Sequence, residues 1–135
     1  MMRLPDWEAR LHAYLASLEG AAFEWGSLDC VLHAAYAILA LTGVDPAAAE
    51  RGKYRTAVGS KRVLRRLGFA NVRDLADTVL AVTPVGMARR GDIVLVGDML
   101  GVCIGADAVF VGEADGEPAL VRHPRSAWLT AWAVG

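Results

Sequence analysis

The sequence predicts an α+β domain in which helices pack on one side of an antiparallel sheet. Over the first two thirds of the chain, apolar residues recur at helical spacing, whereas after Pro84 short β-rich segments alternate with turns made of Gly and Asp. Helices followed by short neighbouring strands favour an antiparallel meander. With 135 residues and 55% apolar content, the chain is predicted to form a single domain over residues 1–135.

The helical part contains one segment that we expect to be buried. Residues 29–41 are apolar nearly all round and stop at Thr42-Gly43, which predicts a central helix. Pro5 and Asp6 suit the start of a first helix that Gly20 ends. The predicted helices cover residues 6–18, 29–41, 58–67 (with a basic outer face) and 71–80 (capped by Asn71), with a short helical turn at 45–49.

The strands are predicted from β-rich runs bounded by turn residues. Gly97-Asp98 separates the first two strands, and Asp115-Gly116 separates the last two runs before the tail. The predicted strands cover residues 93–96, 100–104, 108–111 and 119–122, and the tail 128–134 is expected to add one more.

Composition and charge exclude several classes of protein. A net charge of -1 excludes a polycation that binds nucleic acid, and we expect no specific nucleic-acid partner. Two cysteines cannot form a disulfide scaffold, and no run approaches the roughly 20 apolar residues of a membrane span. Arg3, Pro5 and Asp6 follow within the first six residues, so we expect synthesis in the cytoplasm without a secretory signal.

Charge is nevertheless segregated along the chain. Six acidic residues and no basic one occur over residues 92–117. Over residues 51–73 there is no acidic residue, which indicates either a solvated face or a basic dock for an acidic partner. The basic residues of this segment are Arg51, Lys53, Arg55, Lys61, Arg62, Arg65, Arg66 and Arg73.

The stretch from Phe23 to Cys30 is the most informative for chemistry. It is predicted to be a turn that delivers Cys30 to the first turn of the buried helix. Free N–H groups and partial positive charge at a helix N-terminus stabilise a thiolate, so we expect a lowered thiol pKa and a candidate nucleophile. An isolated buried cysteine is the structural alternative.

The order of these elements resembles a known family. Trp25-Gly26 and Asp29-Cys30 head a helix, Gly91-Asp92 opens a strand, and a strand of pattern Gly-x-x-x-Gly follows over residues 101–105. This resembles the NlpC-type papain-like cysteine peptidases, which cut the peptide stems of bacterial cell wall. The resemblance implies Cys30 as the nucleophile. It implies a substrate and oxyanion region at Trp25, Gly26, Ser27 and Asp29, and no cofactor.

A second resemblance is to a phage- and prophage-borne branch of that family, whose members are encoded among tail genes. It is carried by the same turn and by the runs at 42–46, 51–56 and 131–134. It implies a papain-like fold, a place in the virion at the tail tip, and other tail-tip or hub proteins as partners.

The catalytic pattern of the family is incomplete in this chain. The family's general base aligns with Met99, its orienting polar residue falls near Gly112, and a frequent tyrosine is replaced by Phe23. Methionine can neither take nor give a proton, whereas cysteine-dependent hydrolysis needs a base and a group that orients it.

Histidines elsewhere could supply the base. His33 lies three residues after Cys30 on the same helical face, and His123 ends a late strand from which it could swing toward Cys30. His12 is expected to lie at the surface or in packing. Zinc binding by Cys30, His33, Cys103 and His123 lacks a supporting second ligand pair, and we expect no metal.

Two functions remain open on the sequence alone. One is a tail-tip assembly protein with a peptidase-like fold and impaired catalysis, and the missing base favours it. The other is an active cysteine peptidase or amidase that opens peptidoglycan during phage DNA entry, with Cys30 as nucleophile and His123 or His33 as base. An unrelated cytoplasmic thiol protein is a third reading.

Overall fold

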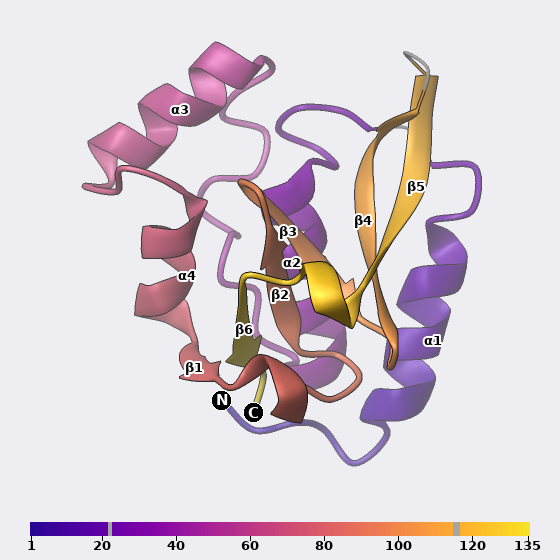
Figure 1. The fold of residues 1–135 in the computed structure, drawn as a ribbon. Coiled ribbons are helices and arrows are strands. Elements are labelled where there is room, and N and C mark those ends of the chain that lie inside the picture. The colour runs from indigo at the N-terminus through magenta and orange to yellow at the C-terminus, as the bar shows by residue number, and fades with distance from the viewer. Residues whose placement is uncertain (22, 115–116) are drawn as a thin grey trace.

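A computed structural model describes residues 1–21, 23–114 and 117–135 and has an α+β architecture (Figure 1). The predicted α+β class is therefore confirmed. The helices in the described part are α1 (Trp7–Ser17), α2 (Cys30–Thr42), α3 (Ala57–Arg66) and α4 (Val72–Val79). The strands are β1 (Ala81–Thr83), β2 (Ile93–Val96), β3 (Met99–Cys103), β4 (Asp107–Ala114), β5 (Glu117–Pro124) and β6 (Thr130–Ala133).

The sheet is antiparallel at every junction and has the order β1-β6-β2-β3-β4-β5. Strands β2 to β5 form the expected meander, and β6 returns to lie beside β2. The three-residue strand β1 was not predicted, because it is too short and too exposed to produce a period-two pattern.

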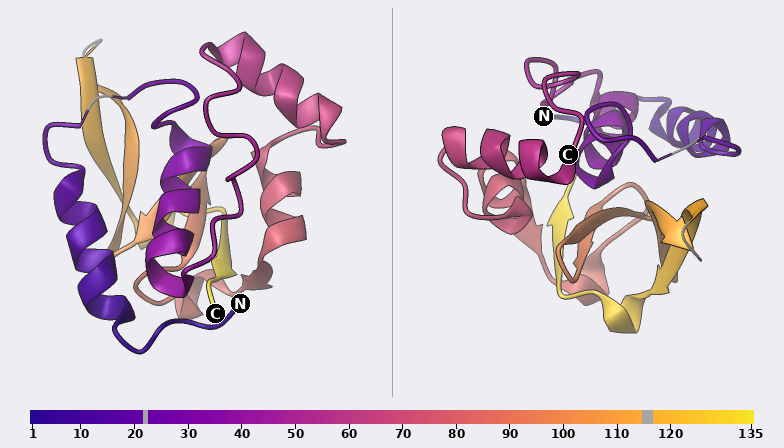
Figure 2. Two further views of the ribbon diagram at one scale, coloured as in Figure 1. Left: turned by 180° about the vertical axis from the view of Figure 1, so that it is seen from behind. Right: turned by 90° about the horizontal axis from the view of Figure 1, so that it is seen from above.

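The helices cover one face of this sheet (Figure 2). Helix α2 is the most buried of them, as predicted, and packs on alternate residues of β2, β3 and β6. The residues that form this first core include Ala34, Ala37, Ile38 and Leu41 of α2, Ile93 and Leu95 of β2, Leu100 and Val102 of β3, and Trp132 of β6.

A second core lies on the opposite face, which the curled sheet encloses (Figure 2). It contains Val94, Phe110 and Trp128, all buried. Gly101 of β3 makes room for this core, because a Cβ there would lie 2.5 Å from the Phe110 ring. The glycine in the Gly-x-x-x-Gly strand is thus explained by packing.

Side chains cap three of the helices. Asp29, Thr56 and Asn71 accept hydrogen bonds from the backbone N–H groups of the first turns of α2, α3 and α4. Residues 45–49, expected as a short helix, form turns instead. The Asp45 carboxylate there accepts a hydrogen bond from the Ala47 N–H, an arrangement that favours a turn.

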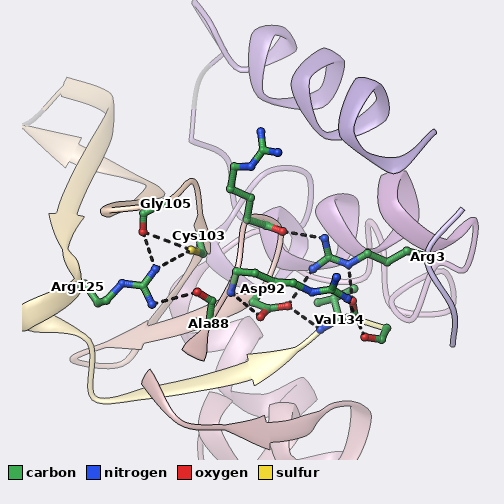
Figure 3. A network of polar contacts seen from close by, with 10 residues as sticks. Arg3, Ala88, Asp92, Cys103, Gly105, Arg125 and Val134 are labelled. Carbon is green, nitrogen blue, oxygen red and sulfur yellow. Dashed lines mark hydrogen bonds and ion pairs between the residues drawn. The ribbon is translucent and has the colours of Figure 1, made fainter. Parts of the chain in front are cut away.

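One buried carboxylate joins the two ends of the domain (Figure 3). Asp92 Oδ1 accepts hydrogen bonds from the Arg3 guanidinium at 3.0 Å and from the Val134 N–H at 3.0 Å. Its Oδ2 accepts from the Arg89 N–H at 2.9 Å. Asp92, noted in the sequence as part of Gly91-Asp92, therefore holds the two ends of the chain together at the start of β2. Within the described part of the chain, no helix is long and apolar enough to cross a membrane.

Candidate functional site

The turn that precedes α2 is organised by the buried carboxylate of Asp29. Its Oδ1 accepts the Leu32 N–H at 3.0 Å, which caps the helix, and its Oδ2 accepts the Gly26 N–H at 3.0 Å. The Tyr54 hydroxyl donates to the same Oδ2 at 2.5 Å. Three donors thus hold an acid that is only 1% exposed.

Tyr54 belongs to the segment that closes over this turn. The Gly52 N–H donates to the Gly26 carbonyl at 2.9 Å. Gly26 has φ +81°, and a Cβ there would lie 1.8 Å from the Tyr54 carbonyl oxygen. No residue but glycine fits this position without moving the backbone. The run at 51–56, noticed in the sequence without a physical reason, therefore fixes the turn that carries Cys30.

Cys30 occupies the first position of α2 and is half-buried at the floor of a cleft of about 320 Å³. We call this hollow the Cys30 cleft. It lies between the N-terminus of α2, helix α3 and the start of α4. Its lining comprises Trp25, Asp29, Cys30, Val31, Ala57, Ser60, Lys61, Leu64, Arg65, Ala70, Asn71, Val72 and Asp98.

The expected low pKa of the Cys30 thiol is wrong. Burial, together with the nearby carboxylates of Asp29 and Asp98, raises its pKa to about 11. Hydrogen bonds from the backbone of Leu100 and Val31 counter only part of this rise. Desolvation together with two carboxylates therefore outweighs these hydrogen bonds, and the thiol is protonated at neutral pH.

His33 points away from this cleft and is locked in the interior. Its Nε2 lies 2.9 Å from the Val109 carbonyl oxygen, and its Nδ1 lies 2.6 Å from the Tyr14 hydroxyl. Because a carbonyl can only accept, Nε2 carries the proton and Tyr14 donates to Nδ1. Burial lowers the pKa of His33 to about 4. Both ring nitrogens are occupied, so His33 is not free to serve Cys30.

His123 lies on the far side of the sheet from Cys30. It pairs with Ala108 in the β4–β5 register and packs edge-on against the Phe110 ring, with the ring centres 5.0 Å apart. Both neighbours belong to the second core. The body of the sheet therefore separates His123 from α2. His12 is exposed on α1, as expected.

The positions aligned with the family's other catalytic residues hold no group that could act as a base beside Cys30 either. Met99 packs against the second core, on the opposite face of β3 from Leu100, which faces α2. Gly112 lies in β4. Phe23 packs edge-on against Trp25, with the ring centres 4.9 Å apart.

The predicted substrate and oxyanion region is only partly assembled. Trp25 and Asp29 line the Cys30 cleft, whereas Gly26 is buried in the turn and Ser27 is exposed elsewhere. Sequence reasoning missed Lys61, Arg65 and Asp98 as lining residues. The sequence shows the basic residues at 61–66, but no pattern in it indicates that they lie beside Cys30.

In chemical terms, the cleft combines a protonated thiol with charged walls. Among the described residues, no histidine lines it, and no three His, Cys, Asp or Glu side chains gather into a metal site. Cys103, another ligand considered from the sequence, is buried on the second-core face beside the Arg125 guanidinium (Figure 3). The arrangement can bind a ligand by charge and shape, but none of the described lining residues is a histidine that could act as a base for thiol chemistry.

Fold and site together define a small α+β domain with a cysteine-bearing helix N-terminus at the floor of a charged cleft. A family model described as a domain of unknown function (DUF6950) matches residues 2–134. The chain belongs to that family. No curated protein and no solved structure matches the chain.

Proposed function

We propose that this chain is a phage tail-tip protein, carried in the virion, that uses a papain-like, NlpC-type fold for assembly and has little or no peptidase activity. Two features support the fold assignment. A cysteine heads the central buried helix, and that helix packs on an antiparallel meander. The motifs that carry the resemblance, Trp25-Gly26 with Asp29-Cys30, form one tightly bonded turn.

The single observation that carries the loss of activity is that the described lining of the cleft offers the thiol no histidine as a base. The charged side chains that shift the pKa of the thiol are the carboxylates of Asp29 and Asp98, and they raise it. Loss of a general base typically costs about 10²–10⁴-fold in rate.

The alternative, an active peptidoglycan hydrolase, requires His33 or His123 to reach Cys30. Both ring nitrogens of His33 are hydrogen-bonded, to Tyr14 and to the Val109 carbonyl. The sheet lies between His123 and the thiol. Neither arrangement favours that alternative.

The activity is tested by incubating the purified chain with peptidoglycan sacculi and soluble muropeptides, beside a Cys30→Ala control. We expect no release of peptide fragments that depends on Cys30. Robust turnover that disappears in Cys30→Ala would refute the proposal, and His33→Ala and His123→Ala would then identify the base. The location is tested by mass spectrometry of particles purified from a producing strain, in which the chain should be a component.

A further inference from the structure

We propose that the Cys30 cleft is a docking groove for an acidic polypeptide segment of a partner protein, whose carboxylates bind Lys61 and Arg65. This inference rests on the proposed assembly function and names the chemistry of the partner at that site.

The cationic wall of the groove is formed by one face of α3. Lys61 and Arg65 are four residues apart, so they lie one above the other, and both line the cleft. Both are exposed. Within the described residues, neither forms an ion pair with the chain itself, whereas Arg3, Arg51 and Arg90 each do.

Neighbouring charges make this wall more positive. Arg62 and Arg66 sit on the adjacent face of the same helix, and residues 51–73 contain no acid. Asp29 is held at the inner end of the cleft, where three hydrogen bonds occupy its carboxylate oxygens. Asp98, across the cleft, is the one acid of the described lining that no hydrogen bond engages. The groove is therefore basic along α3 and acidic at its far rim.

The floor of the groove selects the kind of anion. Apolar side chains of Val31, Leu64 and Val72 lie beside the two cations. At about 320 Å³, the cleft is at the lower end of volumes that hold small ligands, which range from about 300 to 1,000 Å³. An inorganic anion would leave the apolar floor uncovered. An extended peptide that alternates acidic and small apolar residues covers the floor and reaches both cations.

The test uses the full chain and a synthetic peptide of alternating glutamate and alanine, blocked at both ends, with a glutamine-for-glutamate peptide as control. Binding is followed by the change in tryptophan fluorescence, to which Trp25 contributes because it lines the cleft, and by protection of Cys30 from N-ethylmaleimide. We expect the glutamate peptide alone to bind and protect. Its affinity should fall toward zero as ionic strength approaches about 1 M, where the Debye length is about 3 Å.

Matched variants locate the groove. Lys61→Glu with Arg65→Glu should weaken binding about tenfold or more, because two attractive ion pairs become repulsive. Arg62→Glu with Arg66→Glu makes the same change in net charge on the same helix and should have a far smaller effect. Asp98→Asn should strengthen binding, because it removes the acid at the rim.

Three results would overturn this inference: equal binding of the glutamine peptide, equal loss in the two double variants, or protection of Cys30 by muropeptides but not by the glutamate peptide. None of these results requires hydrolysis. Failure of the docking inference is therefore separable from failure of the proposed function, which Cys30-dependent turnover or absence of the chain from purified particles would show.

Discussion

Lowering the pH should destabilise the fold through His33. The neutral ring donates to the Val109 carbonyl and accepts from Tyr14, so a second ring proton would place a positive charge in a buried site. The pKa of His33 is lowered from 6.5 to about 4 by burial. The unfolded chain therefore binds a proton at a higher pH than the folded chain does.

The sign and size of the effect follow from that difference. Stability is fully retained above about pH 6.5, falls as the pH drops toward 4, and stays low below it. At about 1.4 kcal/mol for each pKa unit, the loss across this window is ~3 kcal/mol. That is a large part of the about 5–15 kcal/mol by which domains are stable.

Urea unfolding followed by tryptophan fluorescence, at several pH values between 7.5 and 4, measures this loss. His33→Gln is the control: it should be less stable at pH 7.5 but show a shallower decline with acidification, because it lacks the titrating ring. Carboxylates titrate in both proteins and cancel in the comparison. Parallel pH profiles for the two proteins would refute the assignment of His33 as a buried neutral residue.

Other substitutions test the turn and the thiol. Tyr54→Phe should lower the free energy of unfolding by about 1.5–3 kcal/mol, because the hydroxyl donates to the buried carboxylate of Asp29, and a loss below about 0.5 kcal/mol would argue against that bond. Cys30 should be alkylated faster than Cys103, because Cys30 is half-buried and Cys103 is 0% exposed. Mass spectrometry of partly labelled protein measures the two rates, and faster labelling of Cys103 would mean that the Cys30 cleft is closed. Met99→His should not produce peptidase activity, because that side chain packs in the second core; a gain of hydrolysis would mean that β3 presents its other face to Cys30.

The sequence was sufficient to predict most of the fold because its periodicities are strong. The buried helix, the basic amphipathic helix and the β2–β5 meander each show an uninterrupted pattern bounded by turn residues. The order of the sheet was not predictable in full, since the return of β6 beside β2 depends on contacts distant in sequence. The hydrogen bond from the Val134 N–H to the Asp92 carboxylate is one such contact.

The candidate site was less predictable than the fold. The position of Cys30 at the head of α2 could be derived from Asp29 and the apolar run that follows. The raised pKa of the thiol could not be derived from the sequence, because it depends on desolvation and on Asp98. That residue lies in the turn between β2 and β3. The alignment of Met99 with the family's general base also could not show which face of β3 carries that side chain. In this chain Leu100 and Val102 face the helix, and a shift of one residue reverses the face.

The carboxylate of Asp92 has a consequence for how this domain can be built into larger proteins. Because Arg3 and Val134 bind the same side chain, the polypeptide enters and leaves the domain at one point (Figure 1). That point lies near the C-terminal end of α2, where the Leu4 N–H donates to the Leu41 carbonyl, and Cys30 lies at the other end, ~18 Å away along a 13-residue helix. The whole unit could therefore be inserted into a loop of another protein, or its ends joined by a short linker and reopened elsewhere, with the cleft still facing outward.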